Sequence, residues 1–234
     1  MANVSFSVER GEYVAIMGES GSGKTTLLNI LAALDKPTSG EVWLGDRKLT
    51  DIPEKELAAF RRDNLGFVFQ EFNLLDTFSV RDNIYLPLVL KRMSADDMSL
   101  LIKPLARKLG IDKLLAKYPY EISGGEKQRI SIARAIMKDA PIIILDEATA
   151  NVDPENEAEL QRAIEALTRG KTIIMIAHRL KTVKNADQII VIDHGKISQQ
   201  GTHDELIKQA GIYADFVGMR EKAIGWKIKA DSLA

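Results

Sequence analysis

Short runs of almost wholly apolar residues recur along this chain and alternate with segments of mixed polarity. The runs Tyr13–Met17 and Leu65–Phe69 have the length and composition of buried strands, and residues 142–145, 172–176 and 188–192 repeat the pattern. Residues 24–34, directly after the first run, have the pattern of a helix. Strands that alternate with helices predict an α/β fold with a mainly parallel sheet, covered on both faces.

Two segments depart from this alternation. The opening run around Phe6 and Val8 is a candidate antiparallel edge of the sheet. From residue 72 to residue 120 the patterns are helical, with Pro87 and Pro104 as interruptions, which predicts an inserted helical subdomain. The predicted organisation is an α/β core of residues 1–72 and 126–210, a helical subdomain of residues 73–125, and a C-terminal helix and tail of residues 211–234.

Composition narrows the class of protein. The 234 residues include no cysteine and three histidines, which excludes disulfides and thiol catalysis and disfavours a zinc site. A net charge of −1 argues against a nucleic-acid partner. No run approaches the roughly 18 apolar residues of a membrane span, and the first residues do not have the pattern of a signal peptide. We expect a cytosolic protein that reaches any membrane process through a partner.

The segment Gly18–Thr25, GESGSGKT, fits the phosphate-binding loop G-x-x-x-x-G-K-[ST] and lies between a predicted strand and a predicted helix. Glycines let backbone N–H groups surround phosphate oxygens, and the helix N-terminus adds positive potential. Lys24 would reach the β- and γ-phosphates, and Thr25 would ligate Mg²⁺. The alternative is an ordinary Gly/Ser turn that contains a lysine. The candidate phosphate-binding residues are Gly18, Ser20, Gly21, Ser22, Gly23, Lys24, Thr25 and Thr26.

An acidic pair follows the apolar run that starts at Ile142. Asp146 and Glu147 would lie at the carboxyl end of a strand, where doubly wound sheets bind their ligands. Asp146 could then hold Mg²⁺ through water, and Glu147 could act as general base for the attacking water. Strands also end in acids for no functional reason, so the pair gains weight only together with the phosphate loop. The absence of an Asn-Lys-x-Asp guanine reader favours ATP over GTP.

A second Ser-Gly motif, Ser123-Gly124-Gly125-Glu126, opens a predicted helix that runs to about Met137. Ser123 with Glu126 forms a capping box, which is a sufficient structural explanation of the motif. Two glycines nevertheless weaken a helix start, and they indicate close approach of another group to the backbone. A second anion site is the functional alternative.

Taken in order, these motifs resemble the ATP-binding domain of ABC transporters over nearly the whole chain. The phosphate loop is similar to the Walker A motif, and Ile122–Glu126 is similar to the signature motif, with Ile and Glu where Leu and Gln are commonest. The remaining similar segments are Phe67–Glu71 (the Q-loop, with Gln70), Ile142–Glu147 (Walker B and the catalytic glutamate), Ala150–Asp153 (the D-loop) and Ile176–Arg179 (the switch histidine, His178).

The resemblance implies a P-loop NTPase fold and a mechanism. Two copies would close head to tail around two Mg²⁺-ATP molecules, each held between one phosphate loop and the other copy's Ser123-Gly124-Gly125. Gln70 would bind Mg²⁺ or the water, and His178 would contact the γ-phosphate. Asp153 would communicate across the interface. A membrane-spanning transporter subunit would dock on the helical subdomain, placing the chain on the inner face of the cell membrane.

The resemblance also has uneven parts. Residues 67–121 are similar to the separate ATPase subunits of antibiotic-peptide resistance and lipoprotein-release transporters, and residues from about 127 onward to exporter ATPase domains. We therefore hypothesise a join between Ser123 and Arg134, natural or engineered. The aromatic residue that stacks on adenine in the family would precede Met1, so we expect ATP binding weakened by about 1–3 kcal/mol.

Three readings of the function stay open at this point. The first is ATP hydrolysis that powers transport, with export favoured by both resemblances. The second is an engineered or truncated ABC ATPase fold with weak or no turnover, and the third is a non-transport ABC ATPase. The helix expected at Val80–Lys91 offers Ile84, Tyr85 and Leu88 either to the membrane partner or to the subdomain's own core.

Overall fold

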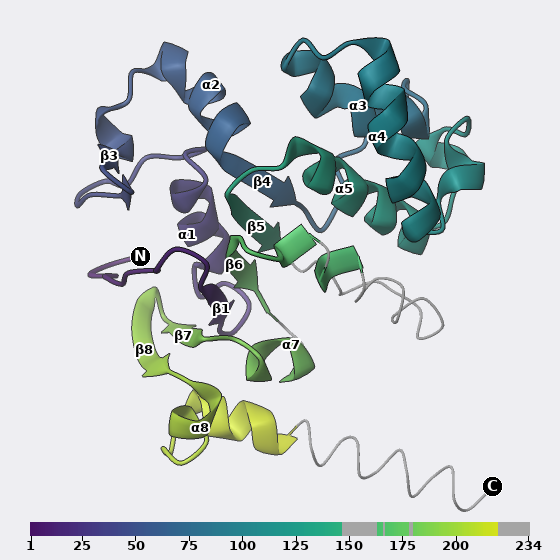
Figure 1. The fold of residues 1–234 in the computed structure, drawn as a ribbon. Coiled ribbons are helices and arrows are strands. Elements are labelled where there is room, and N and C mark those ends of the chain that lie inside the picture. The colour runs from purple at the N-terminus through teal and green to yellow at the C-terminus, as the bar shows by residue number, and fades with distance from the viewer. Residues whose placement is uncertain (147–162, 166, 178–179, 220–234) are drawn as a thin grey trace, which may run out of the picture.

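Residues 1–146, 163–165, 167–177 and 180–219 are described by the structure, which is a computed structural model. Within them a six-stranded sheet runs in the order β4-β5-β6-β1-β7-β8, and β2 and β3 form a separate pair. Figure 1 shows the larger sheet through the middle of the molecule, with α3, α4 and α5 gathered beside its β4 end. The chain is therefore an α/β protein with a distinct group of helices, as the sequence predicts.

The bounds of the elements follow. The strands are β1 (Tyr13–Met17), β2 (Trp43–Leu44), β3 (Arg47–Lys48), β4 (Leu65–Val68), β5 (Ile142–Asp146), β6 (Thr172–Ile176), β7 (Gln188–Asp193) and β8 (Lys196–Gly201). The α-helices are α1 (Lys24–Leu31), α2 (Glu54–Asn64), α3 (Val80–Leu90), α4 (Ala95–Lys108), α5 (Gly124–Lys138), α7 (Leu180–Lys184) and α8 (His203–Leu206), and residues 212–219 are also helical. Short 3₁₀ turns occupy Leu49–Asp51, Asp112–Leu114 and Pro119–Glu121.

The strands β4, β5, β6, β1 and β7 are parallel to their neighbours, and β8 pairs antiparallel with β7. The antiparallel edge of the predicted fold is thus β8. The opening run is not a strand: Val4, Phe6 and Val8 lie outside the assigned strands and pack, partly buried, against the cluster around Ile16 and Ile190. Their alternating apolar side chains thus cover part of the core without strand pairing.

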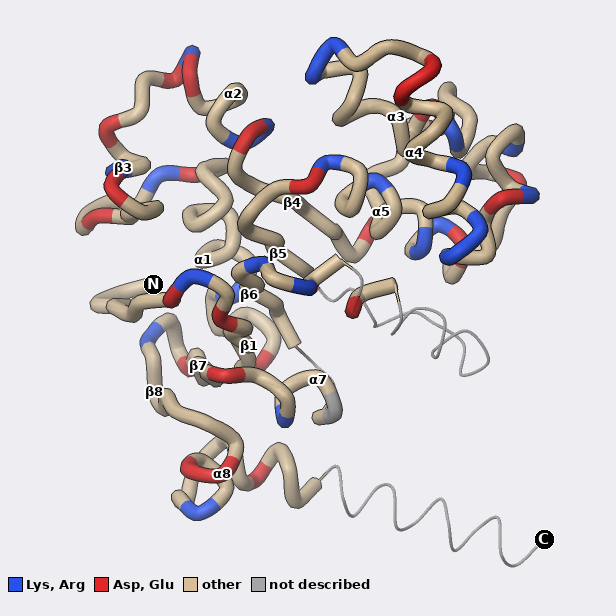
Figure 2. The backbone as a smooth tube through the Cα atoms, viewed as in Figure 1, with Lys and Arg blue, Asp and Glu red and all other residues tan. Residues whose placement is uncertain are grey.

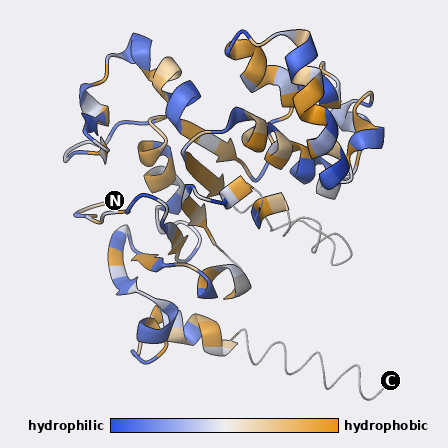
Figure 3. Cartoon of the chain, in the orientation of Figure 1, coloured by the Kyte–Doolittle hydropathy of each residue, from blue (hydrophilic) through white to orange (hydrophobic). Residues whose placement is uncertain are grey.

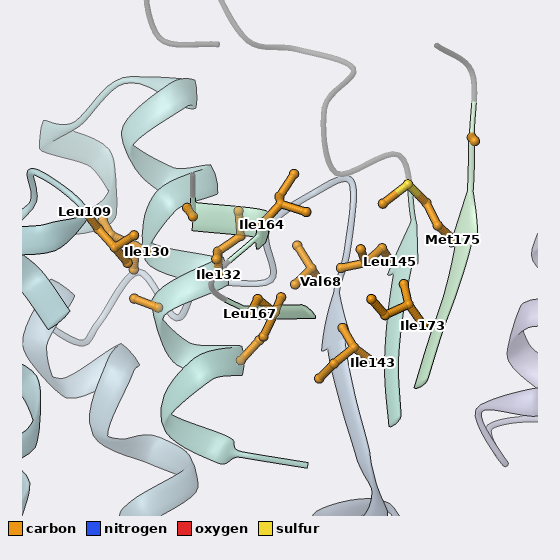
Figure 4. Packing of buried hydrophobic residues seen from close by; sticks show 14 of the residues in the cluster. Val68, Leu109, Ile130, Ile132, Ile143, Leu145, Ile164, Leu167, Ile173 and Met175 are labelled. Atoms are coloured by element: carbon orange, nitrogen blue, oxygen red, sulfur yellow. The ribbon is translucent and has the colours of Figure 1, made fainter. Parts of the chain in front are cut away.

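The two faces of the central strands are covered by different helices, because successive side chains point to opposite sides. Ile144 and Ile176 face α1 and pack with Leu28 and Ala32. Ile143, Leu145, Ile173 and Met175 belong to the other face, in the large cluster that contains the buried side of α5. Figure 4 shows this packing, with Ile132 of α5 beside Val68 and Leu145 of the sheet. The strands that carry the sequence motifs are therefore held rigidly from both sides.

Helix α5 joins the helical segment to the sheet. It packs on α3 and α4 and also on β4. The same buried cluster includes Ile84 and Ile102 of the helical segment and Val68 of β4. In Figure 3 apolar colour runs through the sheet and continues into the inner sides of these helices. The helical segment thus shares its core with the sheet through α5.

Helix α3 decides between the two roles left open for its apolar residues, contact with a membrane partner or packing of the subdomain's own core. Ile84 and Leu88 are 0% and 2% exposed, so they fill the core and offer no docking surface. The apolar residues that α3 does expose are Val89 and Leu90, at 53% and 63%. Pro87 lies inside α3 and Pro104 inside α4, so neither proline ends a helix here.

Charges of both signs are mixed over the described surface. Figure 2 shows basic and acidic residues interspersed along α2 and over the helical segment. Pairs such as Lys171–Asp139 (2.8 Å) and Lys48–Glu41 (2.6 Å) join neighbouring elements. Over the ranges described, the structure contains no helix whose length and apolar content suit a membrane crossing.

Candidate functional site

The loop Gly18–Thr25 connects the carboxyl end of β1 to the N-terminus of α1. Its backbone turns through left-handed conformations at Gly18 (φ 152°), Gly21 (79°) and Gly23 (105°). A Cβ atom on Gly18 would lie 2.1 Å from the carbonyl oxygen of Ile192 in β7. Conformation and space together require glycine at that position.

The inside of this loop contains two buried polar side chains, Ser22 and Lys24, which are 6% and 7% exposed. The Lys24 ammonium donates hydrogen bonds to the carbonyl oxygens of Gly18 (3.0 Å) and Glu19 (2.7 Å). The Ser22 hydroxyl is buried without a hydrogen-bond partner. A buried hydroxyl without a hydrogen-bond partner lowers stability. Such a group is expected in a site where a bound ligand supplies the missing acceptor.

The β7–β8 turn supports the loop from behind. Gly195 N–H donates to the carbonyl oxygen of Ser22 at 3.1 Å. His194 and Gly195 both have positive φ, 43° and 74°, as a two-residue hairpin between β7 and β8 requires. The turn lies far from the loop in sequence, and sequence reasoning did not connect the two.

A phosphate chain fits these features. The loop presents backbone N–H groups, the Lys24 ammonium and the unpartnered Ser22 hydroxyl. Helix α1 has no acidic residue in its first turn, so its N-terminal field is not cancelled. Ser20, Gly21, Thr25 and Thr26 are exposed at the rim of the loop, where bound phosphates would lie.

Hard oxygen donors accompany the loop at the same edge of the sheet. Asp146 is the last residue of β5, and Gln70 lies just past the end of the parallel strand β4. Gln70 is exposed to solvent. Carboxylate, carboxamide and hydroxyl oxygens, the last from Thr25, form a donor set that suits Mg²⁺. Gln70 and Asp146 thus follow or end the neighbouring parallel strands β4 and β5, and the phosphate loop follows β1 of the same sheet. That they form one metal and nucleotide site stays a prediction.

Three predicted site residues, Glu147, Asp153 and His178, lie outside the described residues. Two of them directly follow described residues in the sequence: Glu147 comes after Asp146, the last residue of β5, and His178 comes after Ala177, which follows β6.

The Ser123 motif is placed at the N-terminus of α5, away from the strand ends. Ser123 and Glu126 form the predicted capping box, with Ser123 N–H donating to the Glu126 carboxylate (2.7 Å) and Glu126 N–H donating to the Ser123 hydroxyl (3.3 Å). Partial burial would raise the pKa of Glu126, but its hydrogen bonds from Ser123 lower it on balance. Ser123 and Gly124 are exposed, and a Cβ on Gly124 would meet nothing within 4 Å. The local capping role is therefore confirmed, and no contact among the described residues explains why residue 124 is glycine.

Two polar residues near Gln70 were missed by sequence reasoning. Arg134 of α5 donates to the carbonyl oxygens of Phe72 (2.7 Å) and Asn73 (2.6 Å). Asn83 of α3 is fully buried and bonds the backbone of residues 75, 78 and 79. An isolated Asn or Arg on a helix gives no sequence signal, because its partners are set by tertiary contact.

Comparison with known proteins places this geometry in a family. The family model described as "ABC transporter" matches residues 1–150. The bacitracin export ATP-binding protein BceA of Halalkalibacterium halodurans is 42% identical over 202 residues, covering 86% of this chain and 80% of that protein. The ATP-dependent lipid A-core flippase of Cupriavidus pinatubonensis is 40% identical over 223 residues, covering 92% of this chain but 37% of the flippase.

Solved structures agree. The dimeric, post-hydrolysis structure of the ATP-binding cassette MJ0796 bound to ADP and Pi, a protein of Methanocaldococcus jannaschii, superimposes with a TM-score of 0.79 at 34% identity. The match covers 86% of this chain and 89% of that one.

Proposed function

The chain belongs to the ABC transporter family as an ATP-binding, ATP-hydrolysing domain, and we propose that it works as a head-to-tail pair of copies that uses Mg²⁺-ATP to drive export through a membrane-spanning partner. The observation that carries the proposal is the phosphate loop itself. Its glycines adopt positive φ, Lys24 is buried, and the Ser22 hydroxyl has no hydrogen-bond partner among the described residues.

Binding is assigned to the loop and its rim. Backbone N–H groups and Lys24 hold the β- and γ-phosphates, while Ser22 donates its free hydroxyl to a phosphate oxygen. Thr25, Asp146 and Gln70 hold the metal ion, directly or through water. Bound Mg²⁺ would offset phosphate charge and orient the γ-phosphoryl group.

We assign hydrolysis to Glu147 and His178, and communication between the sites to Asp153. Water attacks the γ-phosphorus, its proton passes to the Glu147 carboxylate, and the bond to the β-phosphate oxygen breaks. His178 contacts the γ-phosphate and stabilises the charge that develops on it. Asp153 links the two sites across the dimer.

A second copy would complete each site. Ser123, Gly124 and Gly125 are displayed at an exposed helix N-terminus, with open space over Gly124, and are suited to close on a phosphate held by another copy. The structure of MJ0796, a dimer bound to ADP and Pi, supports this arrangement.

The similar proteins support the proposed membrane-spanning partner and the proposed location at the membrane. BceA is a bacitracin export protein, and the second relative is a lipid A-core flippase. Both names favour export over import for this chain. The chain would then act from the cytoplasm, at the inner face of the membrane, with the helical segment against its partner. The exposed Val89 and Leu90 of α3 and Leu100 and Leu101 of α4 are among the apolar residues available for that contact.

We also retain two predictions about the organisation of the chain. The division into a core of residues 1–72 and 126–210, a helical subdomain of residues 73–125 and a tail of residues 211–234 agrees with the placement of α3 and α4 beside the sheet. A join between Ser123 and Arg134 stays a hypothesis; such a join would fall within α5, which packs on both parts.

The deciding experiment is ATP hydrolysis by the purified chain with and without Mg²⁺, over a range of protein concentrations. We expect turnover that rises faster than linearly with protein concentration and disappears in Glu147→Gln. A folded wild-type chain that binds nucleotide without turnover would contradict the proposal and favour a fold that only binds ATP.

A further inference from the structure

The connection between β4 and α3, residues 69–79, is named here the Gln70 loop. Its first turn contains two consecutive residues in the left-handed region, Phe72 at φ 61° and Asn73 at φ 46°. Asparagine tolerates this conformation, but phenylalanine rarely adopts it. A backbone in this state persists only where surrounding contacts hold it.

Two backbone hydrogen bonds within the loop close the turn, Phe72 N–H to the Phe69 carbonyl oxygen (3.1 Å) and Asn73 N–H to the Glu71 carbonyl oxygen (2.6 Å). The side-chain contacts to its carbonyl groups come from another element. The two terminal nitrogens of Arg134 donate to the two carbonyl groups of this turn, Nη2 to Phe72 (2.7 Å) and Nη1 to Asn73 (2.6 Å). The planar guanidinium suits two neighbouring acceptors, whereas a lysine ammonium is a point donor. Burial lowers the pKa of Arg134, so the side chain is held in place despite an unfavourable setting for its charge.

The rest of the loop is fixed to the helical segment. The Asn83 side chain accepts from Leu75 N–H (2.8 Å) and donates to the carbonyl oxygens of Leu75, Phe78 and Ser79 (3.0–3.1 Å). The loop therefore leaves β4 at the edge of the sheet and is bonded first to α5 and then to α3.

Arg134 also lies on the helix that begins at Ser123, about three turns further along, and so on the same side of α5. Helix α5 is continuous between these residues and buried against the sheet and α3. A displacement of Ser123 is thus transmitted along α5 to the turn that follows Gln70.

We propose that Arg134 is a positioning residue that fixes the Gln70 loop to the helix of the Ser123 motif, so that Gln70 reaches its working position only when that motif closes on a nucleotide. The proposal rests on the function proposed above, in which Gln70 lies at the ATP held by its own phosphate loop, whereas Ser123 of the same chain closes on the ATP held by the other copy. Arg134 itself touches neither nucleotide nor metal.

The test compares Arg134→Met and Arg134→Lys with the wild type. Arg107→Met is the matched control, since Arg107 is an exposed arginine of α4 in the same segment. The first readout is amide hydrogen exchange of residues 69–79 in the nucleotide-free chain. Losing both bonds to a charged donor should accelerate exchange about 10-fold or more in Arg134→Met and less in Arg134→Lys, with no change in the control.

The second readout is the kinetics of Mg²⁺-ATP hydrolysis. We expect kcat to fall about 10-fold in Arg134→Met with KM changed less than about twofold, because nucleotide binds first to the phosphate loop. A structural role alone would lower the melting temperature and leave the kcat of the remaining folded protein intact. If Arg134→Met does not fold, both the exchange and the kinetics are measured on Arg134→Lys.

Three results would overturn the proposal: unchanged exchange in Arg134→Met, faster exchange with unchanged kcat, or full recovery of both by Arg134→Lys. Failure of the function proposed above looks different, because the wild type itself would then show no turnover. The exchange measurement still decides in that case whether Arg134 holds the loop.

Discussion

Two glycines of the phosphate loop allow a sharp test of how the loop is built. Gly18 and Gly21 both have positive φ, so alanine is strained at either position. Their surroundings differ: a Cβ on Gly21 would meet nothing within 4 Å, whereas a Cβ on Gly18 would lie 2.1 Å from the Ile192 carbonyl oxygen and 2.8 Å from the Ser22 hydroxyl. The same substitution therefore separates backbone strain from steric overlap.

The expected magnitudes follow from these distances. Gly21→Ala adds only left-handed strain, about 1–2 kcal/mol in the free energy of unfolding. Gly18→Ala also places alanine at positive φ, and it adds an overlap with the backbone of β7 that requires a shift of about 1 Å. Overpacking of that kind costs about 1–3 kcal/mol more. A rigid, buried strand cannot relax as the end of a flexible side chain does.

The assay is urea denaturation of the two variants and the wild type, with thermal melting as a second measure. Each 1 kcal/mol should lower the melting temperature by about 2–4 °C in a chain of this size. We expect Gly18→Ala to lose about 3–4 kcal/mol and Gly21→Ala about half of that or less. Equal losses in the two variants would refute the claim that β7 packs against the loop at Gly18.

Two further predictions concern buried polar groups. Asn83→Ala removes four hydrogen bonds from a fully buried side chain and leaves Leu75 N–H unpaired. The free energy of unfolding, measured by urea denaturation, should therefore fall by about 3 kcal/mol or more. The control Asn64→Ala loses one bond to Phe60 at the end of α2 and should lower it by about 1 kcal/mol. Burial, together with repulsion from Lys91 and Arg134, lowers the pKa of Lys138 to about 8. Because the unfolded chain binds this proton more tightly, stability should rise as the pH increases from about 8 to 10.5, by about 1 kcal/mol after discounting for solvent screening. Lys138→Met should show a smaller rise over that window and greater stability at pH 7, and an unchanged pH dependence would contradict this assignment.

Local patterns in the sequence were enough to predict the parallel strands and the phosphate loop. The run Thr172–Ile176 is strand β6 with the same bounds, because a short, buried strand in a parallel sheet is apolar at nearly every position. The loop was identified because its chemistry needs glycines and a lysine at fixed spacing within a single turn.

Predictions failed where tertiary contacts override local signals. Helix α1 ends at Leu31, before the predicted residue 34, since Ala33 adopts a left-handed conformation (φ 52°) and the next two N–H groups bond to the Asn29 carbonyl. Pro104 stays inside α4, a helix held by its buried side against the core. The partners of Arg134 and Asn83 lie on other elements or in a loop of irregular backbone, and no periodicity encodes them.

The two halves of the proposed nucleotide site are supported in different ways, and this difference bears on mechanism. The phosphate loop is backed by the β7–β8 turn through Gly195 and is packed against Ile192, so it is formed before nucleotide arrives. The Ser123 motif bonds at its start to its own residue Glu126 and is otherwise exposed. Nucleotide binding to the loop should then need little rearrangement, while closure of the second half depends on where α5 and the helices packed on it stand relative to the sheet. The contact of Arg134 with the Gln70 loop is one of those that orient α5. A membrane partner that shifts such contacts would therefore control hydrolysis without touching the phosphates.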